Sequence, residues 1–431
     1  MGDEGISGVR MEGKGKFGSS GIRQLYGRDL IELSPEVGAA FACMAQSVVV
    51  GRDTRTTSLL IMHGLISGLL SGGAMVLEAG MSPTPSIGYT ARYAKGAAMI
   101  TASHNPEEYN GIKLMNADGS AVTRVQRGEL EKMLGHAPLR DWDHQGEITH
   151  FDAIEVHKNA ILDTVNPGKQ FSAVVDCGNG AGSLLTPYLL DALGQKTITL
   201  NCNPSGRFAR PSEPLPANLP YLEKVMAGTG ADFALIHDGD ADRLVVFLKG
   251  WGFVSGDDLL ILFAKYQEAE RVVTTYDASM AIEEVAEVRR VPVGDAYVSE
   301  ELLRWGDFGG EPSGAIIFPN LSFCPDGIHA AALFCELASE MNVIEELKAI
   351  PRYIMLRESF PCAMAREVVI AMGAEEPTDG VRISTEDGWL LVRASGTEPK
   401  IRITAEGRTK EAAKRMMGKA KKLVRKGHES I

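Results

Sequence analysis

The fold class follows from the segment FSAVVDCGNGAG, residues 171–182. Its first half is short, apolar and rich in valine, which is typical of a buried strand. Its second half is a glycine-rich turn, and a helical pattern begins near Ser183. The same succession starts again from the β-branched runs at residues 47–51 and 271–275. Strands that alternate with helices predict parallel sheets covered by helices on both faces, here in three related α/β units.

Composition limits the class of protein. The 431 residues, at about 150 residues per domain, correspond to about three domains. Hydrophobic residues make up 44% of the chain and charged residues 23%, which excludes a disordered chain. The net charge is 44 − 56 = −12, so the surface is not built to coat nucleic acid. An anionic ligand would require positive groups gathered in one place.

The cysteines and the N-terminal residues indicate a compartment. The six cysteines are irregularly spaced and form no C-x-x-C pair, which argues against a disulfide framework or a zinc site. We therefore expect a reducing, cytoplasmic environment. Residues 1–16 mix glycine, acidic and basic residues without an apolar run, so we interpret them as a flexible extension and not as a signal peptide.

One uncharged stretch, residues 58–77, has about the length of a membrane span. Four glycines interrupt it, together with His63, Ser67 and Ser71. A helix, a turn at residues 71–73 and a buried strand at residues 74–78 explain the stretch better. We therefore expect a protein that does not enter the membrane.

The C-terminal part of the chain has a different pattern. Predicted strands at residues 390–394 and 401–405 flank a loop, and a basic helix over about residues 409–426 follows. That helix has the charges of a solvated surface helix rather than of a docking site. We expect an extension at residues 1–16, α/β domains at residues 17–142, 143–245 and 246–350, and a smaller domain at residues 351–431.

The first segment that carries chemistry is TASHNP, residues 101–106, which follows a predicted strand. A serine at such an exit, Ser103, can act as a nucleophile or phosphoryl carrier, with His104 beside it. For a bare serine, a turn that merely closes a loop is the stronger interpretation. The later segment NGIK returns Lys113 toward the serine, and a lysine there could neutralise a phosphate or move a proton.

The segment DGDADR, residues 238–243, is the strongest metal signal in the chain. Asp238, Asp240 and Asp242 stand at positions i, i+2 and i+4, where their carboxylates can converge on one hard cation. A calcium-binding EF-hand is excluded, because Arg243 and Lys249 occupy the positions that need glycine and glutamate. The pattern favours Mg²⁺ over a merely solvated acidic turn.

Three further loops offer polar groups to a sugar phosphate. Glu311 and Ser313 in GEPSG could bind sugar hydroxyls, although a plain turn is the better interpretation of that segment alone. RASGTEP, residues 393–399, with Arg402 beyond it, places two arginines around a Ser-Gly-Thr turn, which favours a phosphate-binding loop over a simple hairpin. FGSSGIR adds a loop that ends in Arg23, whereas residues 51–55 suggest a structural connection from strand to helix.

Together these loops resemble the α-D-phosphohexomutase family. The motifs FGSSGIR, TASHNP, DGDADR, GEPSG and RASGTEPKIR occur in the family's order and spacing over nearly the whole chain. The resemblance implies an α/β fold with three similar α/β domains that contain mixed sheets, and a smaller α+β C-terminal domain. It also implies a heart-shaped arrangement around a central cleft that holds the active site.

The resemblance further implies roles for individual residues. Ser103 would carry a phosphoryl group and would bind Mg²⁺ together with Asp238, Asp240 and Asp242. The expected catalytic residues also include Arg23, His104, Lys113 and Arg243, while Glu311 and Ser313 would bind the sugar. The substrate's own phosphate would be bound by Arg393, Ser395, Gly396, Thr397 and Arg402.

Within the family, the phosphate, opening and sugar loops are most similar to those of archaeal phosphoglucosamine mutases, with phosphomannomutases and phosphoglucomutases as the alternative. The implied reaction interconverts glucosamine 6-phosphate and glucosamine 1-phosphate through a phosphoserine and a bisphosphate sugar. The expected partners are a hexose or hexosamine phosphate and a bisphosphate sugar activator, without nucleic acid or membrane. A sugar phosphatase and a catalytically silent sugar-phosphate sensor are the rivals.

One residue departs from the family pattern. Many members have a histidine directly after the Ser-Gly of the sugar loop, whereas this chain has Ala315. A hydroxyl that attacks phosphoserine must lose a proton, which alanine cannot accept. We expect nearby Arg23, Arg243 and Mg²⁺ to lower the pKa of Lys113, so that Lys113 acts as the base, with His329 as the second candidate.

Overall fold

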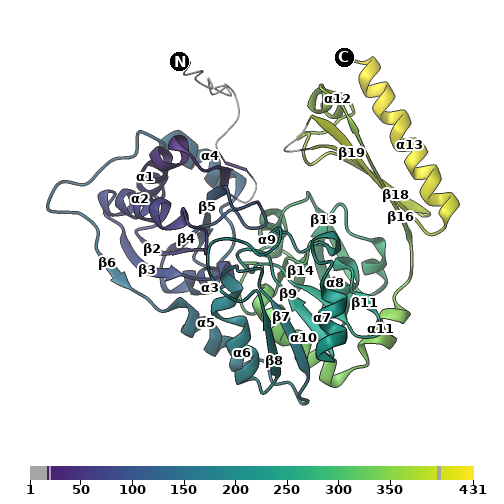
Figure 1. Ribbon diagram of the computed structural model, residues 1–431. Helices are drawn as coiled ribbons and strands as arrows, with labels where there is room; N and C mark the ends of the chain where they lie inside the picture. The colour runs from purple at the N-terminus through teal and green to yellow at the C-terminus, as the bar shows by residue number, and fades with distance from the viewer. Residues whose placement is uncertain (1–16, 19–20, 396–398) are drawn as a thin grey trace, which may run out of the picture.

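The computed structural model describes residues 17–18, 21–395 and 399–431, and these form four sheets in chain order. The sheets define four domains (Figure 1). The first and fourth domains stand on either side of the joined second and third domains. The predicted residues Gly396 and Thr397, and the expected extension at residues 1–16, lie outside the described residues.

The first domain is built on a six-stranded sheet of order β1-β5-β4-β2-β3-β6. Its centre is parallel, and β1 and β5 run antiparallel at one edge, so the sheet is mixed. Its strands are β1 (Ile22–Leu25), β2 (Ser47–Arg52), β3 (Met75–Met81), β4 (Gly96–Ile100), β5 (Tyr109–Asn116) and β6 (Ile148–His150). Its helices are α1 (Arg28–Ala42), α2 (Ser58–Ser71), α3 (Thr84–Thr90), η1 (Ala91–Tyr93) and α4 (Arg124–Met133).

The uncharged stretch at residues 58–77 is helix α2, a turn and the start of strand β3. Its glycines let α2 approach α1 closely, because a Cβ at Gly68 would lie 2.0 Å from the carbonyl oxygen of Pro35. The stretch is thus apolar because helices and sheet bury it. Among the described residues, no helix is both long and apolar enough to cross a membrane.

The second domain has a five-stranded sheet of order β11-β10-β9-β7-β8, in which β10 and β11 are antiparallel. Its strands are β7 (Ser172–Asp176), β8 (Lys196–Leu200), β9 (Phe233–Ile236), β10 (Val245–Leu248) and β11 (Gly252–Phe253). Its helices are α5 (Ala153–Leu162), η2 (Ala181–Leu184), α6 (Thr186–Ala192), η3 (Pro216–Asn218) and α7 (Leu222–Thr229). The sheet therefore continues past residue 245, and the DGDADR loop connects two of its strands.

The third domain has a four-stranded sheet of order β13-β12-β14-β15. Its strands are β12 (Arg271–Thr275), β13 (Glu287–Val291), β14 (Phe308–Gly310) and β15 (Ile316–Ile317). Its helices are α8 (Gly256–Tyr266), η4 (Met280–Glu284), α9 (Asp295–Leu302), α10 (Gly327–Glu340) and α11 (Val343–Ala349). One hydrophobic cluster runs from Ile161 to Ile350, so the second and third domains share a core.

The fourth domain is a fully antiparallel sheet of order β16-β19-β18-β17 with helices on one face. Its elements are β16 (Ile354–Pro361), α12 (Ala365–Ala371), β17 (Val381–Thr385), β18 (Gly388–Ala394), β19 (Lys400–Gly407) and α13 (Lys410–Glu429). The expected basic helix is α13, which buries a stripe that includes Met416, Ala420 and Val424 and leaves most of its lysines exposed. Three α/β domains and a smaller C-terminal domain are therefore confirmed.

Candidate active site

Ser103 lies just beyond the end of β4, in a loop that meets the second domain. Its backbone has φ 50°, in the left-handed region, and its side chain is buried. The hydroxyl donates a hydrogen bond to Asp238 Oδ2 at 3.0 Å. The two loops can approach because residue 239 is glycine, where a Cβ would lie 2.8 Å from the Ser103 carbonyl oxygen. The fold thus presents the predicted carrier serine to the predicted metal loop.

Arg55 holds the serine loop from behind. Its buried guanidinium donates to the backbone carbonyls of Ser103 at 2.8 Å and Asn105 at 2.7 Å. Its Nε donates to Asp53 Oδ2 at 3.0 Å, so the positive charge is paired. Residues 51–55 connect strand β2 to helix α2, as the sequence predicted. Through Arg55 they also fix the conformation of the loop that carries Ser103, which the sequence analysis did not predict.

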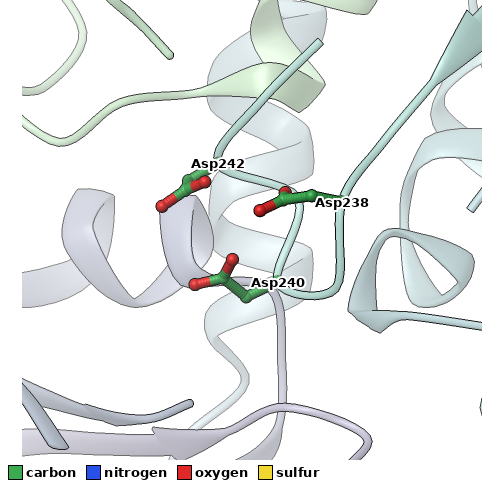
Figure 2. Close-up of side chains that lie close together, drawn as sticks. All are labelled: Asp238, Asp240 and Asp242. Carbon is green, nitrogen blue, oxygen red and sulfur yellow. The ribbon is translucent and has the colours of Figure 1, made fainter. Parts of the chain in front are cut away.

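The three aspartates of the DGDADR loop form one buried cluster. Figure 2 shows the carboxylates of Asp238, Asp240 and Asp242 projecting from a single loop around a common space. One ligand atom from each lies within 4.8 Å of the others. All three Oδ1 atoms are buried and have no hydrogen-bond partner among the described residues. Buried, unpartnered carboxylate oxygens that converge in this way are suited to a hard divalent cation.

The pKa values within the cluster move in opposite directions. Burial, together with the charges of Asp242 and Asp240, raises the pKa of Asp238 well above its ordinary value. Burial also acts on Asp240, but Lys113 and the Thr84 hydroxyl outweigh it and lower the pKa of that carboxyl. The Thr84 hydroxyl, in the first domain, donates to Asp240 Oδ2 at 2.6 Å. The sequence analysis did not predict this contact.

Lys113, on β5, reaches the same cluster. Its Nζ lies 2.9 Å from Asp240 Oδ2 and 2.6 Å from Asp242 Oδ2. Burial would lower the pKa of Lys113, but these two carboxylates raise it well above its ordinary value. The prediction of a lowered pKa counted Arg23, Arg243 and Mg²⁺ and overlooked these two carboxylates, which among the protein's own groups outweigh both burial and Arg23. In this arrangement Lys113 is a charged partner of the cluster.

His104 and the two arginines occupy the other side of Ser103. The guanidinium of Arg243 donates to His104 Nδ1 at 2.8 Å, so that nitrogen is an acceptor and the ring is neutral. Burial and the charges of Arg243 and Arg23 lower the pKa of His104 to about 2. The Nε of Arg243 also lies 4.0 Å from Asp238 Oδ2. Arg23, on β1, acts on the pKa values of His104, Lys113 and Asp240, which places its charge at the same site.

The sugar loop, residues 310–314, meets the metal loop from the third domain. Ala315 forms a β-bridge with Arg243, and the Glu311 carboxylate accepts from the Gly294 backbone at 2.9 Å and from Ser313 Oγ at 3.3 Å. Burial and the charge of Asp295 raise the pKa of Glu311 to about 8. Asp295 also acts on Lys113 and Asp242, so it belongs to the site although sequence reasoning missed it.

The fourth domain contributes the expected phosphate loop. Arg393 on β18 stands directly opposite Arg402 on β19, and Ser395 is buried at the end of β18. Burial lowers the pKa of Arg393, while the charges of Asp277 and Glu311 act in the other direction.

His329 does not join this group. It lies in α10, its ring centroid is 4.6 Å from that of Phe318 with the two rings tilted by 52°, and the charged groups that act on it are Asp326 and His157. Burial lowers its pKa to about 4. The second candidate for proton transfer is therefore a residue of the domain core.

The site and the fold define a class: a four-domain phosphosugar mutase with a serine, an acidic cluster and an arginine loop on different domains. Models of the phosphoglucomutase/phosphomannomutase family match alpha/beta/alpha domain I at residues 14–138, domain II at 149–252, domain III at 255–353 and the C-terminal domain at 342–422. The chain belongs to this family.

Individual relatives agree with this assignment. The chain is 42% identical to a "probable phosphoglucosamine mutase" of Methanosarcina acetivorans, over 91% of this chain and 95% of the relative. A protein of the same name from Pyrococcus horikoshii is 40% identical, over 95% and 97%. A solved "putative phosphomannomutase" from Thermus thermophilus superposes with a TM-score of 0.78 at 26% identity, covering 95% of this chain and 98% of that chain.

Proposed function

We propose that the protein interconverts glucosamine 6-phosphate and glucosamine 1-phosphate, with Ser103 as the phosphoryl carrier. The observation that carries the proposal is the contact between the Ser103 hydroxyl and the buried aspartate cluster. The names of relatives at 40% identity or above supply the choice of sugar. The rest of the site offers what phosphoryl transfer requires, namely positive charge around the transferring group.

In the proposed reaction, phosphorylated Ser103 transfers its phosphoryl group to a hydroxyl of the sugar phosphate. The P–O bond to Ser103 Oγ breaks, a P–O bond to the sugar oxygen forms, and the proton of the attacking hydroxyl ends on Ser103 Oγ, which restores the serine hydroxyl. The product is a bisphosphate sugar. When this intermediate is bound in the opposite orientation, its other phosphate returns to Ser103 and the isomerised monophosphate leaves.

The residues divide this work among four domains. Asp238, Asp240 and Asp242, with the phosphoserine, would hold Mg²⁺, which offsets the negative charge of the transferring group when bound. Arg23, Lys113 and Arg243 surround the same group with fixed positive charge, while neutral His104 accepts from Arg243 and orients it. Glu311 and Ser313 bind sugar hydroxyls. Arg393, Ser395 and Arg402, with Gly396 and Thr397, hold the phosphate that is not reacting.

A direct comparison of substrates tests the proposal. The 1-phosphates of glucosamine, glucose and mannose are supplied side by side with the matching bisphosphate, and each 6-phosphate product is measured. We expect glucosamine 1-phosphate to have the highest kcat/KM. A preference for glucose or mannose would keep the family and overturn the substrate. Release of inorganic phosphate without isomerisation would instead indicate a phosphatase, and ligand binding without Ser103 phosphorylation would indicate a sensor.

A further inference from the structure

We propose that Glu406 is a positioning residue that holds the sheet of the fourth domain against the third domain, at the end of the sheet opposite its phosphate-binding arginines. Only the expected change in KM for glucosamine 1-phosphate rests on the proposed function. Glu406 is a buried carboxylate in β19, far along the strand from the phosphate loop. Its side chain joins the fourth domain to the segment at residues 276–280, which connects β12 to η4. We call this contact the latch.

The latch uses both oxygens of the carboxylate. Oε1 accepts from the Ser279 hydroxyl at 2.6 Å, and Oε2 accepts from the Met280 backbone N–H at 2.7 Å. Oε2 also accepts from Trp389 Nε1 at 2.7 Å, on the neighbouring strand of the same sheet. Two partners thus belong to the third domain and one to the fourth. A carboxylate is costly to bury, and these donors offset that cost through charge-assisted hydrogen bonds.

Strand alternation places the latch and the phosphate loop on one face of the sheet. In β18 and β19, Leu390, Val392, Ile401, Ile403 and Ala405 belong to the core beneath α12 and α13. The alternate positions Trp389, Leu391 and Arg393, and opposite them Glu406, Thr404 and Arg402, therefore share the other face. Four residues separate Trp389 from Arg393, which is about 13 Å along a strand. Glu406 thus holds one end of a rigid sheet whose other end carries the phosphate-binding arginines.

The segment at residues 276–280 is also connected to the site. Strand β12, which runs directly into this segment, pairs with β14, and the Thr274 hydroxyl donates to the Gly310 carbonyl at 2.8 Å, at the start of the sugar loop. Further along the chain, Ser279 of the same segment contacts Glu406. Because one short stretch of chain contacts both the sugar loop and the latch, a displacement at Glu406 changes where Arg393 and Arg402 stand relative to the sugar loop.

The remaining contacts at this junction are modest. Met280, Trp389 and Leu391 form a small apolar cluster, and Arg382 donates to the Tyr276 carbonyl at 3.0 Å. At the surface, Glu284 accepts from the Tyr353 hydroxyl at 2.8 Å and forms an ion pair with Arg408 at 3.6 Å. A cavity lined by Glu406, Ser279, Asp257 and Arg357 lies next to the latch. The fourth domain is therefore joined here by a small number of defined bonds rather than by an extended core, which gives each bond a large share in setting its position.

The experiment compares Glu406→Ala, Glu406→Gln and Ser279→Ala in the full-length protein. Glutamine retains an oxygen for Met280 and Trp389 and should rescue most of the effect, whereas Ser279→Ala removes one bond from the third domain and leaves the sheet intact. Tyr353→Phe is the matched control, because it removes the hydrogen bonds that the Tyr353 hydroxyl donates to Glu284 and accepts from Arg408 at the same junction, and leaves the three bonds of Glu406 in place. The measurements are amide hydrogen exchange at Met280, KM and kcat for glucosamine 1-phosphate, and hydrolysis of phosphorylated Ser103 by water.

We expect faster exchange at Met280 and a KM raised about tenfold in Glu406→Ala, with kcat changed much less, since the substrate phosphate is held equally in the ground and transition states. Hydrolysis of the phosphoenzyme should match wild type, because the Ser103 site is untouched. Unchanged exchange would refute the latch, and faster exchange with an unchanged KM would refute its positioning role. If Glu406→Ala does not fold, the same outcomes are judged on Ser279→Ala, with Glu406→Gln expected to stay close to wild type.

Failure of the proposed function gives a different result. In that case wild-type protein would not isomerise glucosamine phosphates. The variants are then compared by their affinity for glucose 1,6-bisphosphate, measured by calorimetry, alongside the exchange at Met280. Weakened bisphosphate binding that accompanies faster exchange supports the latch, and equal binding in all variants overturns its positioning role.

Discussion

The two phosphate-handling regions of the molecule are built in opposite ways. Around Ser103, segments of the first and second domains are joined by contacts of 2.6–3.0 Å between buried charged or polar groups, and the third domain adds the β-bridge between Ala315 and Arg243. Around Arg393, the binding residues stand at the end of a sheet that contacts its neighbour through the latch and a small apolar cluster. In the proposed reaction one region must hold the atoms that exchange bonds, while the other must accept a phosphate, release it and accept another. A rigid site suits the transfer of the phosphoryl group, and a separately attached domain suits the binding and release of the other phosphate.

The two regions also differ in how their cationic side chains are arranged. In the Ser103 region, Lys113 is paired with carboxylates, so its charge is balanced before any ligand arrives. In the phosphate loop, Arg393 stands directly opposite Arg402, so two cationic side chains lie together on one face of the sheet. In the proposed reaction a substrate phosphate binds beside both of them, whereas the charge of Lys113 is directed at the aspartate cluster.

The largest expected effect falls on the reacting region. Ser103→Ala should abolish phosphoryl exchange with a labelled bisphosphate sugar, lowering it by at least about 10³-fold, because the variant lacks the hydroxyl that carries the phosphoryl group in the proposed reaction. Folding should be preserved, since the backbone bonds from Arg55 remain. Circular dichroism provides the control, and mutase turnover near the wild-type rate would refute the role of Ser103 as carrier.

Asp240→Asn should weaken Mg²⁺ binding by at least about tenfold and depress turnover, because one carboxylate of three loses its charge. The measurement is activity as a function of Mg²⁺ concentration, together with calorimetric titration of the metal. Asp232→Asn is the matched control, since that carboxylate accepts from the Ser172 backbone, away from the cluster. Identical magnesium dependence in wild type and Asp240→Asn would show that the metal is held elsewhere.

Arg393→Gln tests the anchoring region. We expect KM for glucosamine 1-phosphate to rise about tenfold, since charge-assisted bonds to a phosphate are lost, while phosphoenzyme hydrolysis by water stays unchanged. KM reports on the Arg393 region and phosphoenzyme hydrolysis on the Ser103 region, because hydrolysis needs phosphorylated Ser103 but no sugar phosphate. If hydrolysis falls together with kcat/KM, then the division of labour between the two regions is wrong.

The smallest effect concerns stability beside the latch. Burial and the charges of Glu406 and Asp277 raise the pKa of Asp257 to about 6. A carboxyl with a raised folded-state pKa stabilises the protein most at low pH, and this contribution is lost as pH rises through about 6. Asp257→Asn should therefore reduce the fall in unfolding free energy between pH 4 and pH 7, by up to about 2 kcal/mol.

Chemical denaturation of both proteins at a series of pH values measures the effect. Asparagine retains an oxygen for the Ser279 backbone N–H, which donates to Asp257 Oδ1 at 2.7 Å in the wild type. Parallel pH profiles for wild type and Asp257→Asn would mean that Asp257 titrates at its ordinary value. Because the latch shares Ser279, the same samples also report whether this end of the junction depends on pH.

The sequence alone was sufficient wherever the relevant contacts are local. Valine-rich strands followed by glycine turns predicted the α/β domains, because alternation and turn chemistry act within about ten residues. The aspartate cluster was predicted for the same reason, since Asp238, Asp240 and Asp242 share one loop and their proximity needs no knowledge of the fold. The order of the motifs was enough to indicate the family, although not how the four domains are attached.

Only the tertiary structure determined the contacts between distant segments. Lys113 meets Asp240 and Asp242 across 127 and 129 residues, and Thr84 meets Asp240 across 156. The sign of the change in the pKa of Lys113 depends on which charges lie nearest, and sequence cannot supply that distance. Glu406 and Ser279 are likewise 127 residues apart, and neither belongs to a motif. Electrostatic energy depends on the distance between charges in space, so only the folded structure determines how these charged groups act on one another.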